Sequence, residues 1–196
     1  MRDEDIAQVA QVCAADIYGA TIPEHAFPWL FDEKTNTPAA MAQHRWEHRA
    51  QLRADNWTLD FIARDVETQE LVGVVDLSAE NFAAAREVQT ASWVLHRFQG
   101  QGYGTLIRQA VAEFSFSHLD AHSLRTCWIK TNRASARVSE KMGYRIYTEK
   151  KEEAAGPEKI NRPVVSARLS AADYHRPEGV QVDVTGVGEQ LLHMLS

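Results

Sequence analysis

The nine residues RFQGQGYGT, Arg97 to Thr105, place three glycines at alternate positions where one apolar pattern ends and another begins. The preceding VQTASWVLH alternates as a strand does, and the following GTLIRQAVAEFSFSHL keeps its apolar residues on one helical stripe. The predicted order is therefore strand, glycine loop and helix. Backbone N–H groups at a helix start lack intrahelical partners and the helix dipole adds positive potential, so this junction suits phosphate oxygens. The alternative is a tight turn that binds nothing.

Periodicity and turn residues predict an α/β chain on both sides of this junction. Thr37 and Pro38 are typical of a helix cap and first turn, and Gly143 is typical of the left-handed residue that ends a helix. The predicted helices are 3–17, 38–54, 104–119, 132–142 and 189–195, and the predicted strands are 56–65, 71–78, 88–96, 123–130, 144–150, 164–170 and an edge strand at 180–184.

Composition limits the classes of function. The chain has 196 residues, and a net charge of −6 argues against broad binding to nucleic acids or anionic membranes. No apolar run approaches the roughly 18 residues of a membrane span, and MRDEDIAQVA lacks the pattern of a secretory signal. Cys13 and Cys127 lie far apart without disulfide or zinc-ligand spacing, so we expect buried, reduced thiols and no metal. We therefore expect a cytoplasmic globular protein.

Two nucleotide-binding motifs fit the glycine loop poorly. A P-loop requires lysine after its last glycine, but Gly104 is followed by Thr105 and Leu106. A dinucleotide fingerprint requires a third glycine at the position of Thr105, and no βαβ unit surrounds the loop. A nucleotide-binding oxidoreductase therefore stays a weaker alternative.

Two motifs in order carry a family resemblance. Gln99 to Thr105 resembles the Q/R-x-x-G-x-G/A coenzyme loop of the Gcn5-related N-acetyltransferases (GNAT), and NRASARVSEKMGY, Asn132 to Tyr144, is similar to the N-x-x-S-x-x-V-x-x-K-x-G-F/Y signature of the branch that includes ribosomal-protein N-terminal acetyltransferases. The resemblance implies a mixed, mostly antiparallel α/β sheet of six or seven strands, flanked by helices and splayed at the coenzyme site. It covers residues 1–170, with 171–196 expected as an extension packed on the same domain.

The resemblance implies an acetyl-CoA-dependent N-acetyltransferase that needs no metal. The acetyl group would pass directly to a primary amine of a small molecule or a protein N-terminus, with no nucleic acid or membrane as partner. A silent acyl-CoA-binding sensor or interaction module is the alternative. Many family members have a tyrosine acid seven residues after the position of Asn132, where this chain has Ser139.

The resemblance also assigns residues to the coenzyme. In the branch concerned, the position of Ser135 lies near the thioester sulfur and gives it a catalytic role, while Asn132 holds the pantetheine arm. A helix cap is the alternative for Asn132, and a hydrogen bond within the helix is the alternative for Ser135. The expected coenzyme-binding residues are Val94, Leu95, Gln99, Gly100, Gln101, Gly102, Tyr103, Gly104, Thr105, Asn132 and Ser135.

The general base is harder to assign. An alkyl ammonium has a pKa near roughly 10, so a group must remove its proton before attack. The strand face that holds Ser92 and Val94 carries no carboxylate, and Glu87 at the start of that strand points the other way unless a bulge re-aims it. We rank Glu87 first, against the alternative of a solvated surface residue. The further candidates are Glu80, Asp76, Glu24, His25 and Asp32.

Two features of the N-terminal third bear on substrate and assembly. The aromatic Phe27, Trp29 and Phe31 lie in the loop between the first two helices, where they would line the acceptor pocket or plug the core. The family usually opens with a strand that this sequence lacks, because Met1 leads directly into an acidic helix start. We therefore expect an open sheet edge, covered by the segment 180–184 or by a partner, for which a homodimer is one arrangement.

Overall fold

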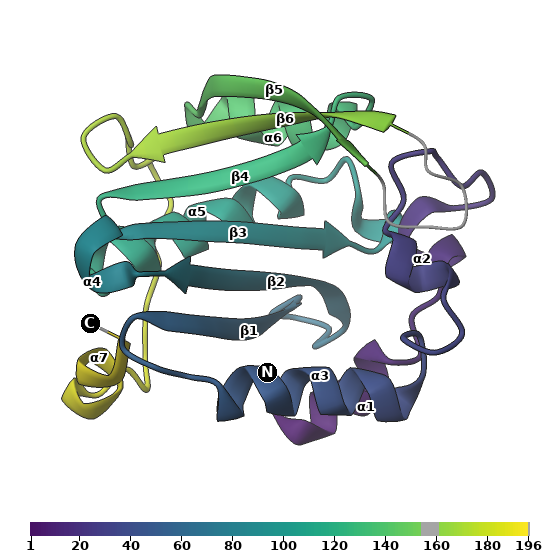
Figure 1. Ribbon diagram of the computed structural model, residues 1–196, viewed down its shortest axis with the longest axis horizontal. Coiled ribbons are helices and arrows are strands. Elements are labelled where there is room, and N and C mark those ends of the chain that lie inside the picture. The colour runs from purple at the N-terminus through teal and green to yellow at the C-terminus, as the bar shows by residue number, and fades with distance from the viewer. Residues whose placement is uncertain (154–160, 196) are drawn as a thin grey trace.

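A six-stranded sheet forms the centre of the protein, and α5 and α6 lie behind it in Figure 1. The structure, a computed structural model, describes residues 1–153 and 161–195. The strands follow the order β1-β2-β3-β4-β6-β5, and β3 and β4 run parallel while the other neighbouring pairs are antiparallel. The strands are β1 (Asn56–Arg64), β2 (Leu71–Glu80), β3 (Glu87–Val94), β4 (Ser123–Ile129), β5 (Arg145–Glu153) and β6 (Asn161–Ser170). The helices are α1 (Asp3–Val9), α2 (Ala14–Tyr18), η1 (Pro28–Phe31), α3 (Pro38–Ala50), α4 (Phe82–Ala85), η2 (His96–Phe98), α5 (Tyr103–Ser117), α6 (Arg133–Met142) and α7 (Glu189–Leu195). This is the mixed, mostly antiparallel sheet that the sequence predicts.

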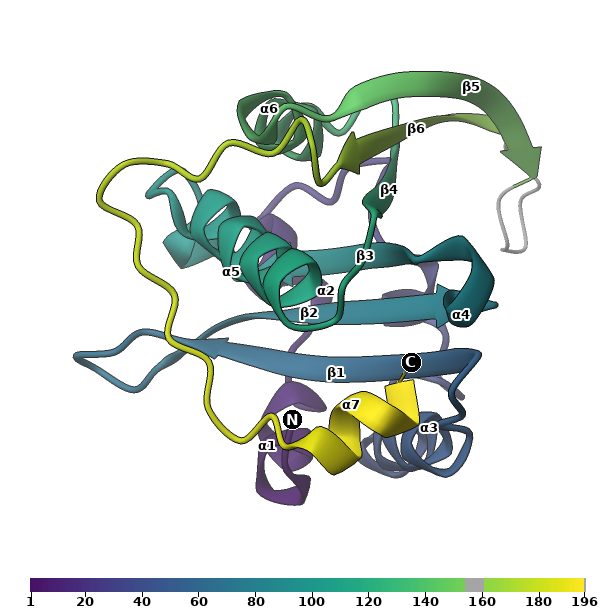
Figure 2. The same cartoon turned by 90° about the vertical axis from the view of Figure 1, so that its left-hand side faces the viewer.

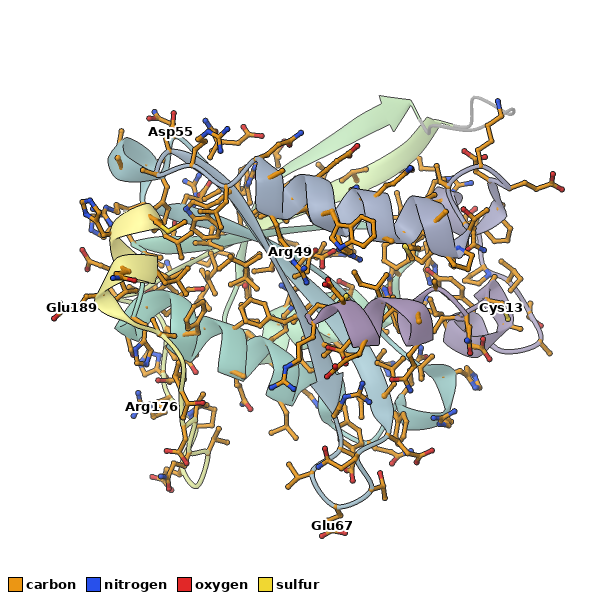
Figure 3. All side chains as sticks on the ribbon, turned by 90° about the horizontal axis from the view of Figure 1, so that it is seen from below. Cys13, Arg49, Asp55, Glu67, Arg176 and Glu189 are labelled. Carbon is orange, nitrogen blue, oxygen red and sulfur yellow. The ribbon has the colours of Figure 1, made fainter. Side chains whose placement is uncertain are left out.

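The N-terminal segment forms two helices where the sequence predicts one. α1 ends at Val9, and Asp16 begins a new helix by accepting a hydrogen bond from the N–H of Cys13 at 2.8 Å. The break allows Val12 and Ile17 to be buried together in the core below α3. Cys13 is exposed at the rim of the molecule (Figure 3), so the prediction of a buried thiol is wrong here.

Cys127 is also exposed, which corrects the second half of that prediction. On β4 the buried side chains alternate, and Cys127 belongs to the outward set between the buried Thr126 and Trp128. In a strand covered on one face, every second residue remains accessible.

α3 starts as predicted and lies along the edge strand β1. The Thr37 hydroxyl accepts a hydrogen bond from the N–H of Ala40 at 3.1 Å, and Pro38 occupies the first turn. Near its other end, Arg49 donates to Asp3 Oδ1 at 2.6 Å and ties α3 to α1 (Figure 3). One face of β1 and β2 is thereby held against the N-terminal helices.

Alternation along the strands gives the sheet two cores. Leu77 and Val88 pack on the face covered by α5, whereas Val74 and Trp93 pack on the opposite face with α1, α2 and α3. From Val74 onward on β2, and along β3, a residue's parity therefore determines which group of helices it meets.

β3 and β4 separate as they approach the glycine loop. The parallel register joins 87–90 to 123–126, and the last pair is Thr90 with Thr126. Beyond this pair, β3 stays paired with β2 and β4 with β6, so a gap opens between the two parallel strands. This is the splay that the resemblance implies.

The sheet begins at β1, whose outer edge pairs with no strand in the described part of the chain. The Met1 amine donates to the Asp60 carbonyl on this edge at 2.5 Å. The predicted edge strand at 180–184 is wrong, because this segment passes beside α5 as irregular chain and leads to α7 (Figure 2). α7 is anchored by the buried Leu195, whose carbonyl accepts a hydrogen bond from the Trp57 indole at 3.1 Å.

Across residues 1–153 and 161–195, no helix combines the length and the apolar character that crossing a membrane requires.

Candidate functional site

The glycine loop presents bare backbone to solvent at the start of α5. Gly100 and Gly102 have φ of 76° and 94°, in the left-handed region that favours glycine, and a Cβ at either position would meet nothing within 4 Å. In the described chain, none of the N–H groups from Gly100 to Gly104 donates to another protein atom. These donors, together with the α5 dipole, form an anion cradle that fits a diphosphate.

β3 directs alternate backbone groups into the gap beside β4. The Leu95 N–H donates to the Val72 carbonyl at 2.8 Å, so Leu95 faces β2. Because neighbouring strand residues direct their backbone groups to opposite sides, the N–H groups of Ser92 and Val94 face the gap. Val94 therefore has the orientation that a pantetheine or thioester ligand needs. The Leu95 N–H is already used by the sheet, so the prediction for Leu95 could hold only through its other atoms.

Two loop side chains fix the shape of the loop. Gln99 donates through Nε2 to the carbonyl groups of Ile17 and Val94 at 2.7 and 2.8 Å. The Tyr103 hydroxyl donates to Asp65 Oδ2 at 2.5 Å, in the turn between β1 and β2. The side chains of Gln99 and Tyr103 thus bind protein, and Tyr103 offers the cradle its backbone N–H.

Gln101 and Thr105 also use polar groups for hydrogen bonds within the loop. Gln101 donates through Nε2 to the Arg97 carbonyl at 2.7 Å, which leaves its N–H for the cradle. The Thr105 N–H donates to the Gly102 carbonyl at 2.9 Å, so only the Thr105 hydroxyl is available to a ligand. Any diphosphate here would be bound chiefly by peptide N–H groups.

The second motif lies at the start of α6. The Asn132 side chain caps the helix by accepting a hydrogen bond from the Ser135 N–H at 3.0 Å, which is the alternative role that the sequence allows. Its amide NH2 has no protein partner in the described chain, so capping and coenzyme binding are compatible. Ser135 is half-buried, and Ser139 lies one turn further along, 2% exposed.

A pocket of about 380 Å³ lies on the α3 face of the sheet, beside the strand that borders the gap. Phe27 and Trp29 form one wall, with ring centroids 6.2 Å apart and an interplanar angle of 26°. Trp93 contributes from β3 and Asp76 from β2. Phe31 is 55% exposed and does not line this pocket, so two of the three loop aromatics lie where the resemblance places the acceptor.

Asp76 belongs to a cluster of buried charges between α3, β1 and β2. Arg45 Nη1 contacts Asp60 and also donates to Asp76 Oδ1 at 3.1 Å, and His48 Nδ1 lies 3.0 Å from both Asp60 oxygens. The two carboxyl groups also interact with each other, so the charge of one affects the ionisation of the other. The Asp76 side chain is 30% exposed and that of Asp60 only 7%, so Asp76 is the one that meets the pocket.

The pKa values of the two carboxyl groups are shifted in opposite directions. Burial raises the pKa of Asp76 to about 6, and the neighbouring Asp60 raises it further against the opposing charge of Arg45. Burial alone would also raise the pKa of Asp60, but the hydrogen bond with His48 and the charge of Arg45 lower it. His44 lines the same pocket, and burial lowers its pKa. The pocket therefore holds a carboxyl group that changes charge close to neutral pH.

Glu87 lies at the opposite end of β3 from the glycine loop. Its carboxylate pairs with Arg168 Nε at 2.5 Å and with Arg125 Nε at 3.5 Å, and it accepts a hydrogen bond from the Ser123 hydroxyl at 3.1 Å. This arrangement is that of an ion-pair cluster and favours the alternative of a structural residue over the first-ranked assignment of the base. Sequence parity placed Glu87 correctly but could not show these partners.

The other proposed acids and bases lie outside the aromatic pocket. None of the four lines it, and only His25 is even half-buried, with its ring 5.9 Å from that of Tyr18. These residues are Glu80, Glu24, His25 and Asp32.

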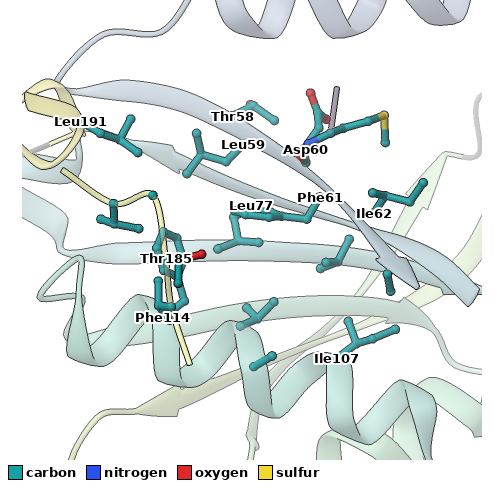
Figure 4. Close-up of a pocket in the computed structure, with 18 of the residues that line it drawn as sticks. Thr58, Leu59, Asp60, Phe61, Ile62, Leu77, Ile107, Phe114, Thr185 and Leu191 are labelled. Atoms are coloured by element: carbon teal, nitrogen blue, oxygen red, sulfur yellow. Dashed lines mark hydrogen bonds between the residues drawn. The ribbon is translucent and has the colours of Figure 1, made fainter. Parts of the chain in front are cut away.

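A second, larger hollow of about 720 Å³ follows the open edge of β1. Figure 4 shows Leu59 and Phe61 facing Ile107 and Phe114 of α5, with Thr185 and Leu191 of the C-terminal segment closing one side. The segment that was expected to pair with the edge instead covers this hollow with side chains.

Sequence reasoning named Asp76 only among several carboxylates, and it missed Arg45 and Asp60. One signal was present, because Arg45 lies four residues after the buried Met41 and so on the inward face of α3. A charge on an apolar stripe needs a buried partner, and the partner is Asp60. Within the described ranges, no cluster of three or more His, Cys, Asp or Glu side chains is arranged to hold a metal.

Comparison with known proteins agrees with this geometry. A family model described as an acetyltransferase (GNAT) domain matches residues 1–145. The fold is similar to spermidine N-acetyltransferase from Vibrio cholerae in complex with CoA and spermine, with a TM-score of 0.69 and 15% identity over 89% of this chain and 94% of that chain. It is also similar to Mycobacterium smegmatis RimJ in complex with CoA-disulfide, with a TM-score of 0.71 and 18% identity over 88% of this chain and 80% of that chain.

A dodecameric structure of the Vibrio cholerae enzyme in an intermediate state has a TM-score of 0.65 and 14% identity, over 87% of this chain and 90% of that chain. At such identities the likeness to solved structures establishes the fold, while the family model covers most of the chain.

Proposed function

This chain belongs to the GNAT acetyltransferase family and is an acetyl-CoA-dependent N-acetyltransferase, and we propose that it acetylates a primary amine held in the aromatic pocket beside Asp76. The observation that carries the proposal is the position of Asp76, which opens into the pocket while its neighbour Asp60 is buried. The amine would then lie next to the strand that borders the gap.

The coenzyme would be held mainly by backbone. The N–H groups from Gly100 to Gly104 fit its diphosphate, and the gap between β3 and β4 fits the pantetheine arm. Within the gap, the Val94 N–H can polarise the thioester carbonyl as negative charge develops on its oxygen. The amide NH2 of Asn132 can hold the arm from the other side.

Asp76 would remove the proton that prevents attack. Above its pKa of about 6 the carboxylate is ionised and can both bind an ammonium and accept its proton. The neutral amine then attacks the thioester carbon, the C–N bond forms, and the C–S bond breaks with its electron pair leaving on sulfur. The nitrogen loses a second proton as the amide forms.

The pocket's chemistry indicates the acceptor class. Trp29 and Trp93 offer aromatic surface, and Asp76 is the one carboxylate in the described lining. A single carboxylate, which Arg45 of the same lining contacts, favours one ammonium on an apolar group, either in a small amine or at a protein N-terminus. One structural neighbour is a spermidine acetyltransferase, but a polyamine would leave its additional ammonium groups without carboxylates here.

The proposed setting is the cytoplasm, where an exposed thiol such as that of Cys13 stays reduced.

The open edge of β1 supports a homodimer, and one structural neighbour assembles as a dodecamer. Light scattering coupled to size-exclusion chromatography measures the oligomer directly, and a monomer at all concentrations would contradict the dimer.

The test is an acceptor panel monitored for thiol release from acetyl-CoA. We expect turnover with apolar primary amines or N-terminal peptides, and at neutral pH at least about 100-fold lower kcat/KM in Asp76→Asn. Glu80→Gln, an exposed carboxylate on the same strand, is the matched control and keeps wild-type activity. Equal activity of Asp76→Asn and Glu80→Gln would remove Asp76 from the mechanism. Tight acetyl-CoA binding without turnover of any amine would instead favour a silent binding module.

A further inference from the structure

Arg108 is a buried cation that the proposed function does not yet use. It projects from α5, is 5% exposed, and forms no ion pair with a carboxylate among residues 1–153 and 161–195. Burial lowers the pKa of its guanidinium, yet an arginine side chain stays protonated in proteins. A buried charge without a counter-ion is costly, and such groups are rare unless function retains them.

The guanidinium of Arg108 lies where β3 and β4 begin to separate. Nη2 donates to the Thr126 hydroxyl at 2.5 Å, and Thr126 forms with Thr90 the last pair before the gap. The Thr126 hydroxyl in turn donates to the Thr90 carbonyl at 3.4 Å. Nη1 is enclosed and has no protein partner in the described chain.

The aromatic ring of Tyr144 limits the site on another side. The Arg108 guanidinium carbon lies 5.9 Å from the centre of this ring, and the Tyr144 hydroxyl also interacts with Thr90. Burial raises the pKa of Tyr144, so its hydroxyl stays protonated at neutral pH and does not neutralise the arginine. Cys127 is the other titratable side chain whose charge acts on Arg108.

The same place is where the reacting end of the coenzyme belongs. The diphosphate cradle is at Gly102, and Arg108 is six residues further along α5, about 9 Å along the helix axis. An arm bound by the cradle and inserted between β3 and β4 therefore extends toward the closed end of the gap. In many relatives a tyrosine would protonate the thiolate from the position of Ser139, which is a buried serine here.

We propose that Arg108 stabilises the negative charge on the thiolate that leaves during acetyl transfer. This rests on the proposed function, since it concerns the leaving group of that reaction. When the C–S bond breaks, its electron pair stays on sulfur, and the fixed positive charge of Arg108 lowers the energy of this anion in an enclosed, weakly screened site. No proton donor is required for the bond to break. The proton lost by the nitrogen as the amide forms later converts the thiolate to the thiol.

The decisive measurement is the pKa of the coenzyme A thiol bound to the protein without acceptor, followed by ultraviolet absorbance of the thiolate. A free thiol titrates near roughly 8.5, and we expect the bound thiol of the wild type to titrate at least about one unit lower. In Arg108→Met the bound thiol should titrate at or above the value in solution. Desulfo-coenzyme A, which has no thiol, is the control. Its titration gives the absorbance changes that come from ionisation of Cys127 and Tyr144, which are subtracted.

Kinetics supply a second readout. Arg108→Met should lower kcat about 100-fold or more, as the loss of one preorganised electrostatic group does. Arg108→Lys keeps the positive charge and should therefore retain part of the wild-type kcat. The substitution is expected to leave the melting temperature unchanged or higher, because an apolar side chain of similar volume replaces an unpaired buried charge. Should Arg108→Met fail to fold, Arg108→Gln keeps the polar contact to Thr126 without the charge and serves the same test.

Two results would overturn the inference. One is an identical thiol pKa in the wild type and the charge-free variant. The other is a loss of activity in Tyr144→Phe that equals the loss in Arg108→Met, which would make the tyrosine hydroxyl the thiol's proton donor. The thiol titration needs no acceptor amine, so it remains informative if the proposed acceptor or the role of Asp76 proves wrong.

Discussion

Asp60→Asn is expected to shift the pH profile of acetyl transfer to lower pH. Asp60 lies beside Asp76, raises its pKa, and competes with it for the single guanidinium of Arg45. The substitution removes a negative neighbour and leaves Arg45 to Asp76 alone. Both changes favour the ionised form of Asp76, so both lower its pKa.

The size of the shift follows from the contacts. The pKa of Asp76 is raised to about 6 from an ordinary 3.8, and burial, which the substitution leaves in place, is the first cause. Two charges at about 4 Å interact by about 4 kcal/mol at an effective dielectric constant of 20. Asp60 is partly neutralised by Arg45 and His48, so we assign it about a third of that, or about 1.4 kcal/mol, which is about one pKa unit. The midpoint of the acid limb should therefore fall from about 6 to about 5.

The assay is kcat/KM for a good acceptor between pH 4.5 and 8, measured where circular dichroism shows both proteins folded. Activity should rise with pH through the wild-type midpoint because only ionised Asp76 accepts the proton. Asp60→Asn should reach its plateau at lower pH, and the plateau itself should be lower because a weaker base removes the proton less well. Glu80→Gln should reproduce the wild-type profile. A midpoint that stays in place or moves upward in Asp60→Asn would refute the coupling of the two carboxyl groups.

Three further outcomes test the cradle, the pocket and the C-terminal segment. Gly102→Ala should weaken coenzyme A binding at least about tenfold in calorimetry, because its φ of 94° is strained for alanine by about 1–2 kcal/mol and relaxation would turn the N–H groups away. Trp29→Ala should raise the KM for an apolar amine about tenfold with little change in kcat, since it removes binding surface and no reacting group. Leu195→Ala should lower the free energy of unfolding by about 2–3 kcal/mol in a urea titration, because this side chain is 1% exposed beneath Trp57.

The predictions that succeeded from sequence rest on local chemistry. The φ angle of Gly143 and the cap at Thr37 depend on a few adjacent residues, and both take the predicted form. The mixed, mostly antiparallel sheet followed from the family resemblance, because the periodicity of single strands does not show which strands pair. The first helix broke at Cys13 because a local hydrogen bond to Asp16 competed with continued helical spacing.

The failures concern contacts between elements distant in the sequence. Glu87 and Asp76 are both carboxylates on strands, and only the packing of α3 against β1 and β2 gives Asp76 its buried partners. Leu95 and Val94 are adjacent, and only the register with β2 shows which of the two faces the gap. In the sequence, Arg108 is one charged residue of an amphipathic helix. Only the packing of α5 against β3 and β4 shows that its side chain is buried.

Arg45 and Arg108 are both buried and lie on opposite faces of the sheet. In the proposed reaction, the amine loses its proton on one face and the thiolate forms on the other. Arg45 contacts Asp76 on the α3 face, where the proposed reaction brings in the amine and removes its proton. Arg108 approaches from the α5 face, where Thr90 and Thr126 close the gap and where we propose that it stabilises the leaving thiolate. β3 lies between the two sites, and in the proposed reaction its Val94 N–H would polarise the carbonyl oxygen. A positive charge and a titrating carboxyl group on separate faces cannot neutralise each other, so the sheet keeps the base and the stabiliser of the thiolate apart while the substrate bridges them.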